Sequence, residues 1–234
     1  METVLLESNT GASSVAPALP ENALERRYAE KVGPEQVTYE FTRDLGLLHQ
    51  YYQLREQMFI SVWGLKHFYG GKDKYDDISD ILIARSGNLC VGGGRLTYSS
   101  PKNPIDTPIE YGDFRLQKLF PELDLGSKIY AECTRLALLP EYRTKEISFE
   151  IYRRIVQYHL RIKASYGFWV APLPLARTYR QNCINLGFPC KIRLDIEIPD
   201  KEDYQGIKMC IGVMDFTSAL SAQIPATSNL VTAD

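Results

Sequence analysis

Hydrophobic and polar positions along this chain repeat with two periods, which predict strands and helices respectively. Val37, Tyr39 and Phe41 alternate with polar residues, so residues 37–41 are predicted to form a strand. Apolar runs bounded by turn residues predict further strands over residues 81–85, 89–98, 128–139, 168–171, 189–198 and 207–215. The first two of these runs flank Ser-Gly-Asn, which is typical of a hairpin turn.

Spacings of three and four residues between apolar positions predict helices. The helix expected over residues 44–59 has one apolar face, formed by Leu47, Tyr51, Leu54 and Met58. The helix expected over residues 145–166 has another, formed by Ile147, Ile151, Ile155, Tyr158 and Ile162. Residues 175–186 and 20–31 predict two further helices. The order of elements favours an α/β fold, with a mixed, mostly antiparallel sheet flanked by helices.

Composition separates the two ends of the chain from its middle. Residues 1–20 are rich in Ser, Ala, Gly and Pro and are predicted to form a disordered N-terminal arm. Residues 221–234 are predicted to form a flexible tail. No linker or change in composition interrupts the rest, so residues 21–220 are predicted to form a single domain.

Charge and residue usage argue against several classes of protein. Lys and Arg number 27 and Asp and Glu number 29, a net charge of −2, so nucleic acid is not an expected partner. No apolar run approaches the ~20 residues of a membrane span, and the N-terminus lacks the basic start of a signal peptide. Five cysteines without a CxxC pair indicate free thiols and a reducing, cytoplasmic location.

The sequence also lacks the usual signatures of metal and nucleotide chemistry. The three histidines are widely separated, so neither a zinc site nor a histidine-based triad is expected. No Walker A, GxGxxG or GxSxG pattern occurs. We therefore expect no metal and no bound cofactor.

Charged residues fall instead at positions that predict burial. Arg55 lies on the helix stripe of Leu48 and Phe59, where it either extends to solvent or pairs with an acid. The following loop carries several acids, Asp73, Asp76, Asp77 and Asp80. They form either a solvated acidic loop or a cluster that receives a cation, since the spacing of an EF-hand is missing.

Three consecutive glycines precede Arg95 in the strand over residues 89–98. Glycines inside a strand indicate a bulge, a close approach of the backbone or a ligand surface. Arg95 has the parity of Val91, inside the sheet, and a charge there needs a carboxylate partner. We expect Asp76 or Glu132 within salt-bridge distance of Arg95.

Glu132 and Arg135 lie three residues apart in the strand over residues 128–139. Alternation places them on opposite faces of the sheet unless a bulge intervenes. Apolar neighbours should desolvate Glu132, which suits it to take a proton from an amine, although a nearby arginine would oppose this effect. A structural ion pair is the alternative.

Together these motifs resemble the signature of the autoinducer-synthase family, the N-acyl-homoserine-lactone synthases and the related N-acyl amino acid synthases. The family pattern reads R-xxx-F, a tryptophan, D-xx-D, G-x-RL and E-x-[ST]-R. It is matched in order by Arg55 and Phe59, Trp63, Asp73 and Asp76, Arg95 with Leu96, and Glu132 with Arg135. Residues 120–123, Phe-Pro-Glu-Leu, match a further segment, and the resemblance covers about residues 39–215.

The resemblance implies a GNAT-like acyltransferase fold with a splayed central strand pair. It implies transfer of a fatty acyl group from a thioester carrier to an amine, with no bound cofactor. Glu132 matches a proposed general-base position and is predicted to be catalytic together with Arg95. The predicted amine pocket comprises Arg55, Phe59, Trp63, Asp73, Asp76 and Arg135.

Two departures from the pattern concern the amine. Trp63 follows Phe59 by four residues instead of about six, and Gly71 replaces the acid expected before Asp73. Both positions help to shape the S-adenosylmethionine pocket of lactone synthases. We therefore favour an amino acid as acceptor, with a lactone synthase as the alternative and a non-catalytic acyl- or amino-acid-binding module as a further one.

The loop over residues 141–148 favours an acyl carrier protein over CoA as donor. It lacks the glycines with which acetyl-CoA enzymes of this fold cradle a diphosphate. Arg143 or Lys145 is expected to contact the single phosphate of the carrier, and an acidic carrier would dock on Arg153, Arg154, Arg161 and Lys163. Plausible walls for the acyl chain, which core packing explains equally well, are Leu136, Leu138, Phe149, Tyr152 and Trp169.

Overall fold

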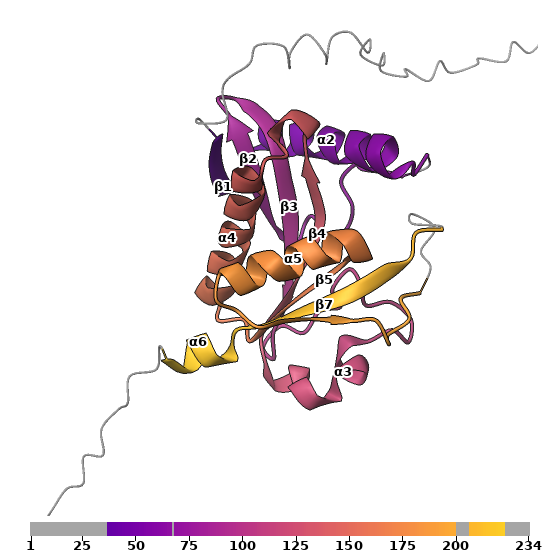
Figure 1. Ribbon diagram of the computed structural model, residues 1–234, viewed down its shortest axis with the longest axis vertical. Coiled ribbons are helices and arrows are strands. Elements are labelled where there is room, and N and C mark those ends of the chain that lie inside the picture. Colours follow the sequence, from indigo (N-terminus) through magenta and orange to yellow (C-terminus); the bar gives the residue numbers. More distant parts are fainter. Residues whose placement is uncertain (1–36, 67, 200–205, 223–234) are drawn as a thin grey trace, which may run out of the picture. The chain divides into compact units, whose positions relative to one another are not determined.

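The computed structural model describes residues 37–222, apart from residue 67 and residues 200–205 (Figure 1). Its strands are β1 (Val37–Thr42), β2 (Asp80–Ser86), β3 (Leu89–Ser99), β4 (Tyr130–Leu138), β5 (Tyr166–Pro172), β6 (Cys190–Arg193) and β7 (Met209–Asp215). Its helices are α2 (Leu45–Trp63), α3 (Leu116–Leu119), α4 (Lys145–Arg161), α5 (Leu173–Asn185) and α6 (Thr217–Ala222). The predicted arm and the helix expected over residues 20–31 lie outside the described residues, as does the tail from residue 223.

The described strands form one sheet in the order β1-β2-β3-β4-β5-β7-β6. All neighbours run antiparallel except β4 and β5, which are parallel. Their ladder joins only residues 130–133 to residues 166–169, although both strands continue further. Beyond this ladder β4 and β5 separate, which forms the splayed central pair that the family resemblance implied.

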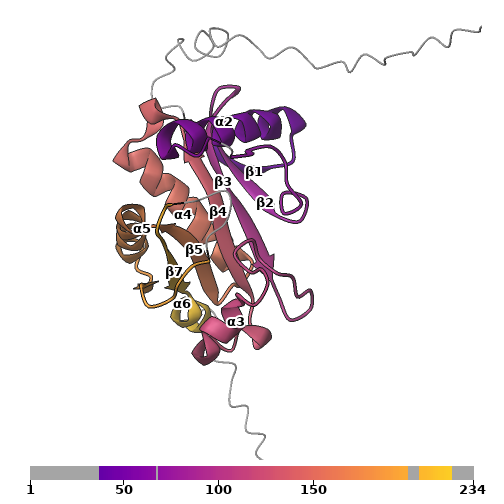
Figure 2. The same ribbon diagram turned by 90° about the vertical axis from the view of Figure 1, so that its right-hand side faces the viewer.

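Helices cover both faces of the sheet (Figures 1 and 2). α2 packs on β3 and β4 from one side, whereas α4 and α5 lie together on the other. α2 begins where the Asp44 carboxylate accepts the Leu47 N–H at 2.8 Å, and it ends at Gly64, whose φ of 67° favours glycine. Tyr51, Leu54 and Met58 of the predicted apolar stripe are buried, whereas Leu47 is half-buried.

The glycines of β3 allow close approach from both sides. A Cβ at Gly93 would lie 2.6 Å from the Leu82 carbonyl oxygen and 2.8 Å from the Tyr51 ring of α2. A Cβ at Gly92 would lie 2.6 Å from Leu138 Cδ1 on the opposite face. Close approach of neighbouring groups is therefore one explanation that applies to these two positions. The register shift between Gly93 and Arg95 shows that the bulge, a second explanation left open by the sequence, is present as well.

Several element boundaries differ from the predicted ones. α4 ends at Arg161 instead of residue 166, because Lys163 adopts a φ of 58° and the Ala164 N–H donates to the His159 carbonyl at 2.9 Å. The strand expected over residues 189–198 is reduced to β6. α3, the short 3₁₀ turns Pro121–Leu123, Leu125–Ser127 and Pro140–Tyr142, and α6 were not predicted.

The second half of the sheet separates two apolar clusters. Trp169 packs with Tyr179 and Cys183 on the α5 side, in one cluster. Its neighbour Phe168 packs with Phe120 on the other side, under α3. Because adjacent strand residues face opposite sides, β5 holds both clusters in place next to the point where it leaves β4.

Candidate active site

Two buried arginines from different elements share one buried aspartate. Arg55 of α2 donates to both oxygens of Asp76, at 3.0 Å to Oδ1 and 2.8 Å to Oδ2. Arg95 of β3 lies 3.2 Å from Oδ1 of the same carboxylate. All three side chains are at most 1% exposed. The predicted pairing of Arg95 with Asp76 is confirmed.

The ion network continues toward β4. Arg95 also donates to Asp73 Oδ1 at 2.6 Å, and Arg135 Nη2 lies 3.9 Å from Asp73 Oδ2. The Arg135 guanidinium carbon lies 4.5 Å from the centre of the Phe68 ring. Arg55 further donates to the carbonyls of residues 70 and 71, so the loop is bound to α2.

The four aspartates of the loop therefore divide into two pairs. Asp73 and Asp76 belong to the network described above. Asp77 is 61% exposed and pairs with Lys72 at the surface. Asp80 begins β2, where it pairs with the exposed Arg43 at 2.9 Å and accepts the Tyr158 hydroxyl at 2.9 Å. Both sequence interpretations, a charged cluster and a solvated acidic loop, apply to different members.

Arg135 lies in a β-bulge. The register between β3 and β4 shifts between Gly93 and Arg95, and Arg135 has a φ of 57°, which is uncommon outside glycine. The Tyr51 hydroxyl of α2 donates to the Arg135 carbonyl at 2.8 Å. The extra residue alters the alternation, so Arg135 and Glu132 line one cavity together.

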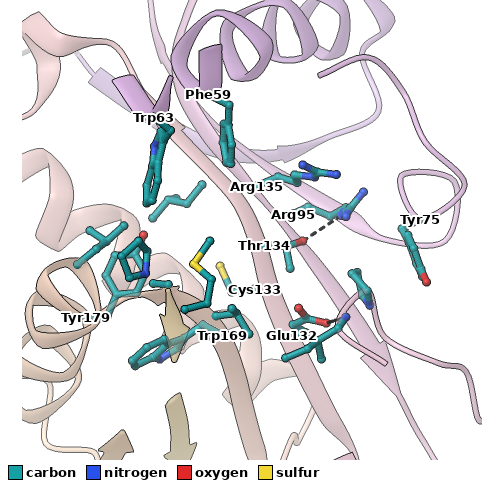
Figure 3. Close-up of a pocket in the computed structure, with 18 of the residues that line it drawn as sticks. Phe59, Trp63, Tyr75, Arg95, Glu132, Cys133, Thr134, Arg135, Trp169 and Tyr179 are labelled. Atoms are coloured by element: carbon teal, nitrogen blue, oxygen red, sulfur yellow. Dashed lines mark hydrogen bonds between the residues drawn. The ribbon is translucent and has the colours of Figure 1, made fainter. Parts of the chain in front are cut away.

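Glu132 is 2% exposed and lies beside Arg95 and Thr134 (Figure 3). Its Oε2 accepts the backbone N–H of Ile109 at 2.8 Å. Arg95 Nε donates to Thr134 Oγ1 at 3.1 Å. A carboxylate, a hydroxyl and two guanidinium groups thus converge at the start of the splay.

The cavity between the diverging ends of β4 and β5 has a volume of about 260 Å³ (Figure 3). Its polar wall comprises Asp73, Tyr75, Arg95, Glu132, Thr134 and Arg135. Its apolar wall includes Leu136, Tyr152, Trp169, Ala171, Leu175 and Tyr179. Phe59 and Trp63, at the end of α2, also line it. A charged amine and an apolar chain could therefore occupy different parts of one cavity.

Aromatic packing shapes the apolar wall. The Trp169 ring lies edge-on to Tyr179 at 5.4 Å, and a Cβ at Gly212 of β7 would lie 2.0 Å from it. Trp169 Nε1 is buried and has no hydrogen-bond partner among the described residues.

Burial and neighbouring charges shift the pKa of two groups near the cavity. Burial alone raises the pKa of Asp73, but the hydrogen bond and charge of Arg95 outweigh it and hold that pKa below its usual value. Burial, and then the charge of Glu132, raise the pKa of the Cys133 thiol to about 12. Cys133 is therefore a neutral thiol near pH 7, which argues against a role as nucleophile.

Some predicted contacts of the acyl donor lie away from the cavity wall. Leu136 lines the cavity, whereas Leu138 packs against Gly92, and Phe149 is not among the lining residues. Arg143 Nε donates to the Leu138 carbonyl at 2.9 Å, and Lys145 begins α4 outside the cavity. The roles predicted for these four residues in binding the donor stay predictions.

Sequence reasoning missed several lining residues. Tyr179 and Leu175 were predicted only as part of a helix, and Tyr75 as part of a loop. Ile109 contributes a backbone N–H, which leaves no trace in the identity of a side chain. One sequence signal could have identified Tyr179 and Leu175 as lining residues. They lie in α5, and a helix that directly follows β5 covers the splayed strands.

The described residues offer neither a metal-binding cluster nor a helix suited to spanning a membrane. No group of three or more His, Cys, Asp or Glu side chains in this part of the chain is arranged to hold a metal ion. None of the described helices combines the length and the hydropathy needed to cross a bilayer.

No family model and no curated protein matches the sequence, but solved structures share its fold. FeeM, an N-acyl amino acid synthase from uncultured soil microbes, aligns with 80% of this chain and 94% of its own at 11% identity, with a TM-score of 0.52. BjaI, a CoA-dependent acyl-homoserine lactone synthase, aligns with 82% of this chain and 90% of its own at 16% identity, with a TM-score of 0.51. At such identities the likeness concerns the fold, and it confirms the GNAT-like acyltransferase fold. Both branches of the family that the motifs resemble occur among these neighbours.

Proposed function

We propose that this chain is an N-acyltransferase that moves a fatty acyl group from a carrier-protein thioester to the amine of an amino acid. The observation that carries the proposal is the cavity at the splay of β4 and β5. It is charged on one wall and apolar on the other, and Glu132 lies where the two strands separate. The fold shared with FeeM and BjaI supports the same class of reaction.

The polar wall suits an amino acid as acceptor. The Arg135 guanidinium, whose side chain is 13% exposed in the cavity, would bind the α-carboxylate, as arginine does in bidentate pairs. The amine would then lie near Glu132. Arg55 and Asp76 are buried behind this surface and would hold Arg95 and Asp73 in place without touching the substrate.

In the proposed mechanism Glu132 takes a proton from the amine as its nitrogen attacks the thioester carbonyl carbon. β5 does not pair with β4 beyond Cys133, so the N–H groups on that edge of β4 can stabilise the oxyanion. The intermediate collapses with cleavage of the carbon–sulfur bond, and the leaving thiolate takes up the proton. The products are an N-acyl amino acid and the free carrier thiol.

The start of α4 supports a carrier protein over CoA. Thr144 Oγ1 accepts the Ile147 N–H at 3.2 Å. The pKa of Glu146 is lowered by a hydrogen bond from the backbone N–H of Glu146 itself and, to a smaller extent, by one from the Thr144 side chain. A helix N-terminus that already holds a carboxylate would repel the diphosphate of CoA. A phosphopantetheine arm carries a single phosphate, so the carboxylate at this site would repel it less than it would repel the diphosphate.

A cytoplasmic location is part of the proposal. All five cysteines are free, and four of them are buried. Free thiols are typical of a reducing compartment, where a carrier-bound donor would also have to be available.

Mass spectrometry of lipid extracts tests the proposal. A host that expresses the chain should contain an N-acyl amino acid that is missing from a host expressing Glu132→Gln. An N-acyl-homoserine lactone in its place would establish the alternative acceptor, S-adenosylmethionine. Tight binding of acyl or amino-acid ligands without consumption of any thioester would show a binding module instead.

A further inference from the structure

Glu110 is a buried carboxylate that the proposed chemistry does not use directly. It is 5% exposed and accepts the Thr107 N–H and hydroxyl, each at 3.1 Å, the Leu116 N–H at 3.0 Å and the Tyr130 hydroxyl at 3.1 Å. An ionised carboxylate has about four acceptor sites, so these donors fill it. Glu110 therefore ties together a loop, the start of α3 and β4.

The loop between β3 and α3, which contains Ile109 and Glu110, contacts β4 at two successive positions on one face. Tyr130 and Glu132 are two residues apart, so their side chains leave β4 on the same side. Glu110 accepts from Tyr130, and its neighbour Ile109 donates to Glu132 Oε2 at 2.8 Å. The Glu110 N–H closes the turn on the Thr107 carbonyl at 2.8 Å. Ile109 lies inside this turn, so its N–H is held by the contacts of Glu110.

We propose that Glu110 is a positioning residue for Glu132 and acts through the backbone N–H of Ile109. This inference rests on the proposed function, in which Glu132 receives the proton of the amine. The Ile109 N–H stabilises the ionised form of Glu132 and restricts its rotation. The carboxylate is thereby held in the orientation in which it receives the proton of the amine.

Shortening the side chain separates positioning from charge. Glu110→Asp keeps the negative charge, but the carboxylate can no longer reach Thr107, Leu116 and Tyr130 together. The Ile109 N–H then moves away from Glu132, whose ionised form loses a donor. We expect the acid limb of the kcat/KM profile to move to higher pH by about one unit. A role in folding alone would lower the free energy of unfolding and leave the limb unchanged.

Titration of Glu132 by carbon NMR gives a readout that does not need turnover. Protein labelled at the glutamate carboxyl carbons, with Glu132 assigned by its loss in Glu132→Gln, should show the same upward shift in Glu110→Asp. The other titratable or charged groups that line the cavity must be considered as the source of any change. They are Asp73 and Tyr75 from the loop after α2, Arg95 from β3, Cys133 and Arg135 from β4, Tyr152 from α4 and Tyr179 from α5.

Asp106→Glu is the matched control, because it changes the length of an acid in the same loop whose side chain is 60% exposed and pairs with Arg115. It should leave both the pH profile and the carbon titration unchanged. If Glu110→Asp does not fold, Tyr130→Phe removes one contact and should shift the titration in the same direction. An unchanged Glu132 titration in the folded variant overturns the inference. A wild-type protein without any acyl transfer would instead overturn the proposed function, and the carbon titration would still decide the role of Glu110.

Discussion

Arg95 Nη1 lies 3.2 Å from Asp76 Oδ1, although the two side chains come from a strand and a loop and both are buried. Asp76 is also bound by Arg55, so one carboxylate holds two guanidinium groups away from water. Buried charges are tolerated only when they are paired in this way. The network therefore joins α2 to β3 and determines where Arg95 and Asp73 line the cavity.

Removing the charge of Arg95 should destabilise the fold. Arg95→Met leaves Asp73 and Asp76 with one cation fewer, and breaking a buried pair costs about 3–5 kcal/mol. Denaturant unfolding measures the loss. Lys72→Met, in the exposed pair with Asp77, is the control and should change stability much less, because water and salt screen that pair. Equal effects of the two substitutions would contradict a structural role of the buried network.

Glu132→Gln should keep the fold and slow the acyl transfer. The amide has nearly the same shape but cannot accept the amine proton, so we expect the rate to fall by about 10²-fold or more. Single-turnover assays at saturating amine, with unfolding curves recorded in parallel, measure both properties. Glu122→Gln, an acid that is 59% exposed, is the control. A wild-type rate for Glu132→Gln would show that this residue only holds the pocket together.

Charge reversal on α4 should weaken the use of a carrier-bound donor. Arg153 and Arg154 are partly exposed and both pair with Glu150, at 2.6 and 2.7 Å. Because acyl carrier proteins are acidic, Arg153→Glu with Arg154→Glu should raise KM for the carrier thioester and reduce its dependence on salt. Lys191→Glu, on the exposed side of β6, is the control. Equal turnover of wild type with the matching acyl-CoA would refute the preference for a carrier.

Acid should destabilise the protein through His159. Burial lowers the pKa of His159 to about 4, and its Nδ1 lies 2.7 Å from the Ile155 carbonyl. The unfolded chain takes up a proton near pH 6.5 and the folded one does not. The free energy of unfolding should thus fall as pH drops from about 6.5 toward 4, by roughly 3 kcal/mol for this group.

Unfolding curves at several pH values check this dependence. His159→Leu should flatten it over this range, because the variant has no group to titrate at that position. His49→Asn, at an exposed position of α2, should retain the wild-type slope. Parallel curves for wild type and His159→Leu would assign the acid sensitivity to another group.

Local residue patterns predicted the helices and strands, because the interactions that form these elements are themselves local. The apolar stripe of α2 depends on neighbours within one helical turn, and it was visible in the sequence. The end of α4 was wrong, since the apolar repeat continues past Arg161 while Lys163 adopts a left-handed conformation. No repeat of apolar residues indicates such a change in backbone direction.

By itself, the sequence determined the fold class, the order of the main elements and the charged residues that had to find partners in the interior. It left open which carboxylate Arg95 would bind and which face Arg135 would take. The tertiary structure decided both, through the loop that brings Asp73 and Asp76 to β3 and through the bulge at Arg135. It alone supplied the Ile109 N–H to Glu132, because a backbone donor is common to every residue except proline and is selected only by packing.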